Sequence, residues 1–278
     1  MKQIFTCPVC GRLLTEEPGR FYCADGHSFD RSAKGYVNLL PPSPKGDHGD
    51  NRRMIAARRM FLEGGWYAPL LDEAVRMAAP HLQVGGTVLD VGCGEGWYTD
   101  GLLSACPLAH GFGVDISKDA LRFAGARQSA REGRLLLAAA SAYHLPVADS
   151  SVNLLWNFFA PMATDEFRRV LAPDGYMLYA VPGPKHLWGL KEILYDTPYE
   201  NQTVNPALPG FSLAEQRAVE AVIRLDDPQQ IQNLFLMTPY AYRTNEAGRA
   251  RLEALTHLCT PISFRLLLYR KADGSAAE

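Results

Sequence analysis

The sequence lacks an apolar run long enough to cross a membrane, and its first residues lack a signal-peptide pattern. We therefore expect a cytoplasmic protein with no membrane-spanning segment. The net charge of −2 excludes a globally basic nucleic-acid binder, but the charge is unevenly distributed. Residues 1–60 hold 10 Lys and Arg against 6 Asp and Glu, whereas the remaining residues hold 18 against 24. A basic front end on an acidic body favours a polyanionic partner for the front end.

The glycine-rich stretch of the chain also lacks two common phosphate-binding patterns. It reads D-V-G-C-G-E-G over residues 90–96, so its glycines run G-x-G-x-G. A dinucleotide fingerprint requires G-x-G-x-x-G, a phosphate loop requires a lysine, and neither is present. The preceding apolar run Thr87–Val91 predicts a buried strand that leads through a glycine turn into a helix. Gly92, Gly94 and Gly96 place no side chain between the backbone and a ligand, so a cofactor can lie against the N–H groups of the turn.

This pattern resembles the first motif of Rossmann-like S-adenosylmethionine (SAM) methyltransferases. The resemblance implies that Asp90, which precedes the first glycine, meets the amino-acid portion of SAM. Asp115 ends the next expected strand, about twenty residues beyond the turn, where a carboxylate is placed to accept both ribose hydroxyls. Methyltransferases of this type hold the adenine after the third strand, which implies Ser141 and Ala142 as contacts. The alternatives are a glycine turn with only a structural duty and an Asp115 that only compensates a helix dipole.

Cysteine is scarce, with six residues in the chain, and three of them cluster near its start. With one histidine they form the pattern C-x2-C-x12-C-x3-H, made by Cys7, Cys10, Cys23 and His27. Three thiolates and one imidazole predict a closed tetrahedral zinc site, which is structural rather than catalytic. A segment of about forty residues buries little apolar surface, so metal binding would supply the missing folding energy. Free cysteines beside a surface histidine are the alternative.

Strand and helix patterns alternate after residue 87, which predicts a parallel sheet with helices on both faces. The expected fold class is α/β: a Rossmann-like class I SAM-dependent methyltransferase sheet preceded by a small zinc-binding ribbon. Residues 34–41 carry aromatic and apolar side chains that would close the ribbon. We expect the zinc-binding, RNA-recognising ribbon over 1–40, a flexible linker over 41–51, the methyltransferase domain over 52–271 and a disordered tail over 272–278.

The segment after the fourth expected strand is placed to meet the substrate. Residues 157–161 read N-F-F-A-P and lack the Asn/Asp-Pro-Pro-Tyr/Phe motif of adenine and cytosine amino methyltransferases. No Pro-Cys pair follows this strand either, so cytosine C5 methylation lacks its nucleophile. Trp156, Phe158 and Phe159 are candidates for stacking on a base, although at least one of them belongs in the core.

A zinc ribbon, a Gly-Tyr-Val-Asn-Leu segment, a proline-rich linker and this core form a rare order along one chain. The sequence resembles, over almost its whole length, the bacterial family of 23S ribosomal RNA guanine-N1 methyltransferases. The resemblance implies that a 23S rRNA hairpin is the partner, that the zinc module helps to grip it, and that the protein is a homodimer. It also implies that Tyr67, Gly94, Glu95 and His186 contact SAM. The resemblance is carried by Cys7, Cys10, Cys23, His27, residues 34–41, 90–96 and 183–186, and Leu236–Pro239.

Guanine N1 carries a proton at neutral pH, so something must remove it before or during attack on the methyl group. The sequence does not identify this base, and Asp165 and Glu166 are candidates only because they lie just beyond the fourth strand. The family has two branches, which methylate neighbouring guanines of the same hairpin loop. Residues 183–187 and 237–240 resemble one branch and residues 157–161 the other, so the choice of guanine stays open.

Two other functions fit parts of the sequence. A small-molecule methyltransferase would share the core, because the fold alone does not select a substrate. A catalytically inactive zinc RNA-binding protein would keep the ribbon and a degenerate core. The ribbon and the basic front end favour an RNA substrate over the first alternative. The intact acid and glycine pattern of residues 90–96, with Asp115, favours activity over the second.

Overall fold

The computed structural model describes residues 2–41, 51–82 and 85–272. Residues 42–50 of the expected linker and 273–278 of the expected tail lie outside these ranges. The boundary between ribbon and methyltransferase domain at 41–51 therefore stays a prediction. Within the described ranges, no helix has the length and apolar character needed to span a bilayer.

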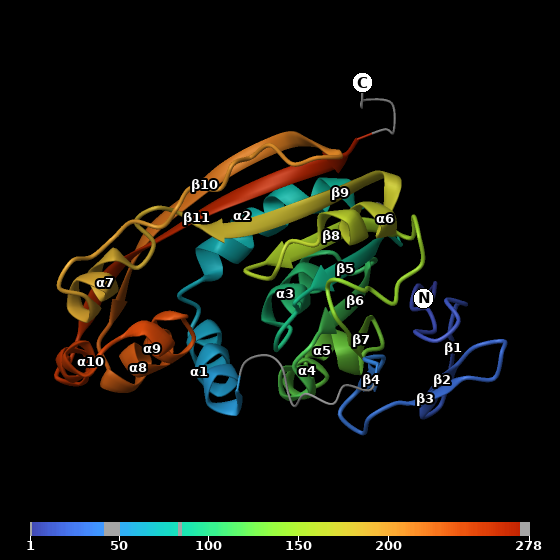
Figure 1. Cartoon of the computed structure of the whole chain (residues 1–278), viewed down its shortest axis with the longest axis horizontal. Coiled ribbons are helices and arrows are strands. Elements are labelled where there is room, and N and C mark those ends of the chain that lie inside the picture. The colour runs from blue at the N-terminus through green and yellow to red at the C-terminus, as the bar shows by residue number, and fades with distance from the viewer. Residues whose placement is uncertain (1, 42–50, 83–84, 273–278) are drawn as a thin grey trace.

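Eight strands form one mixed sheet at the centre of the molecule (Figure 1). Their order is β10-β11-β9-β8-β5-β6-β7-β4. The strands from β9 to β4 run parallel, as the alternating pattern predicts, whereas β11 and β10 are antiparallel additions at one edge. The strands are β4 (Tyr36–Asn38), β5 (Thr87–Val91), β6 (His110–Asp115), β7 (Leu135–Ala139), β8 (Val152–Phe158), β9 (Leu171–Pro182), β10 (Phe211–Leu225) and β11 (Leu258–Lys271).

The helices precede or connect these strands. They are α1 (Arg52–Glu63), α2 (Ala68–Ala78), the 3-10 helix η1 (Ala79–His81), α3 (Trp97–Ala105), α4 (Lys118–Ala124), α5 (Gln128–Arg131), α6 (Thr164–Val170), α7 (Trp188–Leu194), α8 (Pro228–Leu236), α9 (Tyr240–Arg243) and α10 (Glu246–Glu253). Local chemistry explains where several begin. The side chains of Asn51 and Ser117 accept backbone N–H bonds at the starts of α1 and α4, at 3.0 and 3.3 Å. Asp227 does the same for α8, whose first residue is a proline with no N–H to satisfy.

The two faces of the sheet bury different sets of apolar side chains, because successive residues of a strand point to opposite faces. Val88, Trp156 and Leu178 lie on the face that α1 to α4 cover. Leu89 and Leu155 lie on the other face, which α6 and the N-terminal module cover. The sheet is therefore enclosed on both sides, as a parallel sheet must be.

No helix connects β7 to β8, and the N-terminal module (residues 2–31, before β4) supplies the part of the core that such a helix would supply. Residues 140–151, between β7 and β8, form turns and no helix. Ile4 and Phe5 are fully buried over this region, and the ring of Phe5 lies 5.2 Å from that of Phe112 in β6. The backbone N–H of Ala148 donates to the carbonyl of Ile4 at 2.9 Å. The module thus packs directly on the sheet that carries the glycine turn.

A three-stranded antiparallel ribbon forms the rest of the module, made by β1 (Thr15–Glu17), β2 (Arg20–Tyr22) and β3 (Ser28–Asp30). The segment expected to close this ribbon, residues 34–41, also joins the main sheet. Val37 bridges to Arg31 of the ribbon, but β4 as a whole pairs in parallel with β7 of the main sheet. The segment therefore contacts the ribbon and also extends the main sheet. Without β4, the outer N–H and C=O groups of β7 would form an unpaired sheet edge.

The opposite end of the sheet projects beyond its parallel part. Residues 258–263 of β11 pair with β10 alone, because the pairing with β9 begins at Phe264. The helices α7, α8, α9 and α10 gather at this projecting end, next to α1 (Figure 1). Lys191 of α7 is fully buried there, and its Nζ donates to the Tyr199 carbonyl at 2.7 Å and to Asn201 Oδ1 at 2.8 Å.

The packing of the module on the sheet predicts a large effect for Phe5→Ala. The substitution removes a fully buried aromatic ring and should lower the free energy of unfolding by about 3–5 kcal/mol. Urea denaturation measures this directly. Leu13→Ala is the control, because Leu13 lies in the same module but is 55% exposed. Equal effects of the two substitutions would show that the module does not pack on the sheet.

Candidate active site and zinc centre

The four predicted zinc ligands converge at one end of the ribbon, with all four ligand atoms within 4.8 Å of one another. Cys10 Sγ and Cys23 Sγ are 3.6 Å apart, and His27 Nδ1 lies 3.6 Å from Cys7 Sγ and 3.3 Å from Cys23 Sγ. Tetrahedral zinc with bonds of about 2.3 Å to sulfur and about 2.0 Å to nitrogen needs ligand separations of about 3.5–3.8 Å. The donor set and its spacing therefore fit Zn²⁺, with Nδ1 as the histidine ligand atom.

The glycine turn lies at the point where the strand order reverses. β6 is added on one side of β5 and β8 on the other, so the carboxyl ends of β5 and β8 flank a crevice where ligands bind in such sheets. Gly92 has a φ of 79°, which disfavours any side chain. A Cβ at Gly92 would also come 2.4 Å from the Cβ of Ala160, in the loop after β8. Glycine is thus required here because two loops of the site touch.

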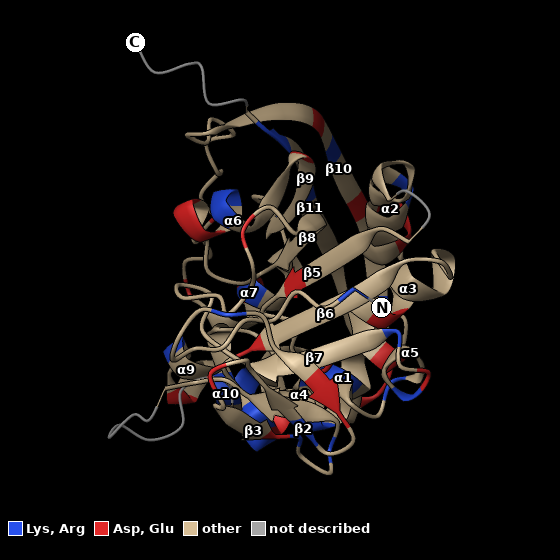
Figure 2. Ribbon diagram, turned by 90° about the vertical axis from the view of Figure 1, so that its right-hand side faces the viewer, with Lys and Arg blue, Asp and Glu red and all other residues tan. Residues whose placement is uncertain are grey.

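Asp115 at the end of β6 organises the turn. One carboxylate oxygen accepts the N–H of Gly94 at 2.8 Å, and the other accepts the N–H of Ser117 at 2.7 Å. Figure 2 shows the carboxyl ends of β5 and β6 side by side, each with an acidic residue coloured red. The predicted ribose contact therefore also holds the turn in place.

Asp90 and Glu95 are acids buried beneath the turn, each 2% exposed. Burial raises the pKa of Asp90 to about 7, although the Thr99 hydroxyl donates a hydrogen bond to it. Burial also raises the pKa of Glu95, and the positive charge of Arg58 acts in the opposite direction. Two buried acids beside Asp115 create a site that is short of positive charge. A cationic ligand would relieve this shortage.

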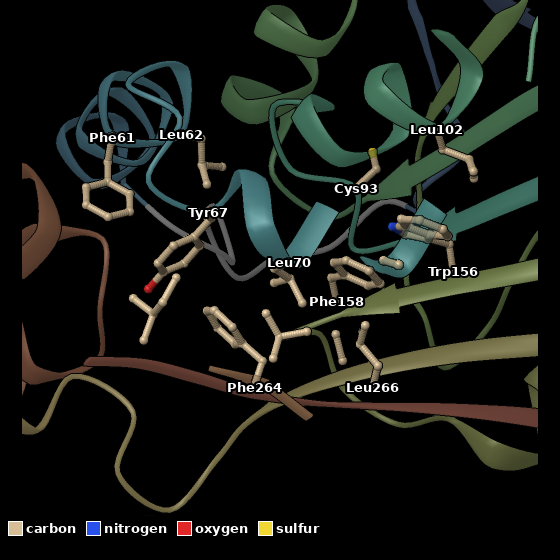
Figure 3. Close-up of a cluster of buried hydrophobic side chains, with 14 of the residues drawn as sticks. Phe61, Leu62, Tyr67, Leu70, Cys93, Leu102, Trp156, Phe158, Phe264 and Leu266 are labelled. Carbon is tan, nitrogen blue, oxygen red and sulfur yellow. The ribbon is translucent and has the colours of Figure 1, made fainter. Parts of the chain in front are cut away.

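His186 and Tyr67, which the family resemblance implies as SAM contacts, form a buried pair. The backbone N–H of Ser263 donates to His186 Nδ1 at 3.2 Å, so the ring hydrogen lies on Nε2. Nε2 is 3.1 Å from the Tyr67 hydroxyl and donates to it. Burial lowers the pKa of His186 to about 3, which keeps the ring neutral at physiological pH. Figure 3 shows Tyr67 next to Phe264, and their ring centroids are 4.9 Å apart.

The three aromatic candidates for base stacking differ clearly in how exposed their side chains are. Trp156 and Phe158 are 0% and 6% exposed and stack on each other at 4.5 Å (Figure 3). Phe159 is 47% exposed and has a φ of 59°, which is rare for a bulky residue. The Asn157 side-chain amide donates to the Pro161 carbonyl at 3.1 Å and closes the loop around it. Phe159 is therefore the aromatic side chain that this loop presents outward.

The remaining predicted residues lie around this edge. Ser141 and Ala142 follow β7 and are partly exposed, and the hydroxyl of Ser141 accepts the N–H of Tyr143 at 3.3 Å. Glu166 accepts the Leu145 N–H at 2.6 Å and pairs with Arg169 at 2.8 Å, and Arg169 lowers its pKa against the effect of burial. Its protein partners favour a structural role for Glu166.

Sequence reasoning missed three residues that position the predicted ones. Thr99 hydrogen-bonds Asp90, Ser263 fixes the tautomer of His186, and Ala160 touches the glycine turn. A polar residue in the first turn of the helix after the glycines was a usable signal for Thr99. Ala160 lies in the segment 157–161 that the sequence marked, but its contact with Gly92 did not show there, and no local pattern marks Ser263 in the distant strand β11.

The sheet, its acidic glycine turn and the ribbon define a class I SAM-dependent methyltransferase with a structural zinc ribbon. A family model described as RlmA, N-terminal, a zinc ribbon, matches residues 5–47, and a methyltransferase-domain model matches residues 88–175.

Curated relatives extend this likeness over most of the chain. A protein of Micromonospora griseorubida, provisionally named a 23S rRNA (guanine-N(1)-)-methyltransferase, is 36% identical over 95% of this chain and 96% of its own. One from Bacillus subtilis, with the same provisional name, is 32% identical over 86% of this chain and 87% of its own. The 23S rRNA (guanine(748)-N(1))-methyltransferase of Streptomyces fradiae is 32% identical over 79% of both chains. The chain belongs to the 23S rRNA (guanine-N1)-methyltransferase family.

The zinc centre predicts a specific result for Cys7→Ser. The substitution removes one of four ligands, so the purified variant should lose its zinc and about 3 kcal/mol or more of unfolding free energy. Elemental analysis and urea denaturation measure the two quantities. Cys259→Ser is the control, because Cys259 is exposed and lies outside the cluster. Unchanged zinc content in Cys7→Ser would refute the site.

The raised pKa of Asp90 predicts a pH-dependent effect of Asp90→Asn. An acid whose folded pKa is about 7, against 3.8 as the ordinary value, makes the protein less stable as pH rises between those values. The neutral amide should therefore stabilise the cofactor-free protein by about 2–4 kcal/mol at pH 8 and by little at pH 4. Thermal unfolding across this range measures the difference.

The same variant should bind SAM more weakly, because it lacks an anion beside a cationic ligand. Asp174→Asn is the matched control, since that side chain is 82% exposed and should show neither effect. A stability difference that does not change between pH 4 and pH 8 would contradict the assignment.

Proposed function

We propose that this protein transfers the methyl group of SAM to N1 of a guanine in a hairpin loop of 23S rRNA. The observation that carries the proposal is the identity with the curated relatives, which extends over the ribbon and the methyltransferase sheet together. A methyltransferase that lacks the ribbon would match these relatives only over the methyltransferase sheet. The ribbon packs on the sheet through Ile4 and Phe5, so the two parts act as one body.

The arrangement of the strand ends supports a definite placement of SAM. Its methionine portion would lie over the β5 turn with Asp90, Gly92, Gly94, Glu95 and Gly96. Its ribose would lie at Asp115 and its adenine at Ser141 and Ala142. His186 and Tyr67 would close the site from the side of β11, since Ser263 of that strand holds the histidine. This order follows the neighbouring strands β5, β6 and β7 across the sheet.

Phe159 is the residue we assign to the target base. Its loop touches the glycine turn through Ala160, so the side chain stands close to the predicted methionine end of SAM. Hairpin-loop bases are unstacked and are commonly held on aromatic rings. The methyl group is then transferred in line to N1, and holding the two reactants in this geometry supplies most of the rate enhancement.

The N1 proton must leave during this step. Asp165 and Glu166 remain the candidate bases from the sequence, but Glu166 is held by Arg169 and has a lowered pKa, which makes it a poorer base. Asp165 is exposed in the first turn of α6, and its side chain lines a surface hollow with Arg168, Arg169 and Lys271.

We also propose that the ribbon and two arginines at the start of α1, Arg52 and Arg53, contact the rRNA backbone, and that the enzyme works as a cytoplasmic homodimer. The basic front end of the chain supports the RNA contact. An rRNA substrate supports the cytoplasmic location. For the dimer, β10 is a 15-residue edge strand with Val222 69% exposed, and such an edge is suited to a second copy. Light scattering on the purified protein tests the dimer.

Primer extension on 23S rRNA tests the function, because a methyl group on N1 blocks base pairing and stops reverse transcriptase. The protein and SAM should introduce one new stop at a guanine of a hairpin loop. The position of the stop would also show which of the neighbouring guanines is methylated. The Streptomyces fradiae relative is named for guanine 748. Methyl label that enters small metabolites but not rRNA would favour the small-molecule alternative. Absence of SAM binding would favour the inactive RNA-binding protein.

Phe159→Ala should lower kcat/KM for rRNA by about 10- to 100-fold, because base stacking on an aromatic ring contributes about 1–3 kcal/mol. SAM affinity should not change, and Phe159→Trp should retain most activity. Radiolabelled methyl transfer and calorimetry measure the two quantities. Leu108→Ala is the control, since Leu108 is 60% exposed and precedes the amino end of β6. Full activity of Phe159→Ala would exclude the stacking role.

A further inference from the structure

The helix α1 brings an arginine to the glycine turn from outside the motif. Arg58 is partly buried, and a side chain at Gly94 would come within 4.0 Å of its Nη1. Its charge also reaches the buried acid Glu95, whose pKa burial raises and Arg58 lowers. Arg58 therefore stands at the β5 turn, over the predicted methionine end of SAM. The predicted contacts to the ribose and the adenine, Asp115 and the residues after β7, come from the sheet and its loops and not from α1.

The charges of SAM give such a cation a definite role. The methionine portion carries an ammonium group, a sulfonium group and one carboxylate. The acids Asp90, Glu95 and Asp115 complement the two cationic groups, but they repel the carboxylate. Glu95 and Asp90 are almost fully buried, so solvent screens this repulsion only weakly. A cation at the methionine end would offset this repulsion.

A second arginine, Arg127, also lies near the turn, and its Nη2 is buried with no hydrogen-bond partner among the described residues. Arg127 Nε donates to the carbonyl of Glu95 at 3.0 Å, and its Nη1 lies 3.4 Å from Glu63. Its aliphatic part packs where a side chain at Gly96 would stand, at 3.5 Å. Arg127 thus fixes the backbone of the turn at Glu95. The Arg58 guanidinium instead approaches Gly94, which has no side chain to separate it from a ligand.

We propose that Arg58 binds the carboxylate of the methionine portion of SAM. The guanidinium would form a charge-assisted pair with that carboxylate above Gly94. Arg58 is then a cofactor-binding residue contributed by a helix that precedes the methyltransferase motifs. The proposal rests on SAM as cofactor and not on the identity of the RNA.

Calorimetry with two ligands that differ by one group tests the proposal. SAM and decarboxylated SAM share the adenosine, the sulfonium and the amine, and only SAM has the carboxylate. Arg58→Gln should weaken binding of SAM by about 10- to 100-fold and change binding of decarboxylated SAM by less than about threefold. Arg59→Gln is the matched control on the same helix, because Arg59 pairs with Glu63 at 2.8 Å and should affect neither ligand.

Equal losses for the two ligands would overturn the proposal, because they would assign Arg58 a structural role. A selective loss in Arg127→Gln, with none in Arg58→Gln, would overturn it in favour of the other arginine. No RNA is present in this experiment. A selective loss in Arg58→Gln therefore supports the proposal even if rRNA proves not to be the substrate, and primer extension tests the rRNA assignment separately.

Discussion

One face of the central sheet has to be covered without a helix between β7 and β8. The N-terminal module meets this constraint, because Ile4 and Phe5 enter the core over β6 and the turns of residues 140–151. The zinc site stabilises a ribbon that is too small to fold around its own core. The N-terminal segment and the sheet therefore form one continuous core.

The electrostatics of the site follow from burial. Asp90, just before the glycine turn, and Glu95, within it, are almost fully buried, so water screens them only weakly and their pKa values rise. The free protein bears this cost at neutral pH, and a cationic ligand at this turn would remove it.

The neutral His186 and the outward Phe159 show how distant strands complete the site. The N–H of Ser263 in β11 fixes the histidine tautomer, and the histidine in turn donates to Tyr67 before α2. The strained backbone at Phe159 is held by the Asn157 to Pro161 hydrogen bond and by Ala160 against Gly92. Strain of this kind persists only where the surroundings determine the conformation, as they do in binding sites.

The parts of this protein that the sequence determined are those whose chemistry is local in the chain. The zinc ligands lie within one short segment, and their spacing alone predicted the cluster that Cys7, Cys10, Cys23 and His27 form. The glycine turn, Thr87–Val91 and Val152–Phe158 were predictable for the same reason, because backbone conformation and strand burial depend on neighbouring residues.

Only the tertiary structure decided which side chains from distant segments meet. Trp156, Phe158 and Phe159 were all candidates for stacking on a base, and the structure buries the two that share one face of β8 and leaves Phe159, beyond the strand, exposed. The pairing of β4 with β7 and the approach of Arg58 to Gly94 join segments with no shared local pattern. Such contacts depend on how whole elements pack, and no window of sequence contains both partners.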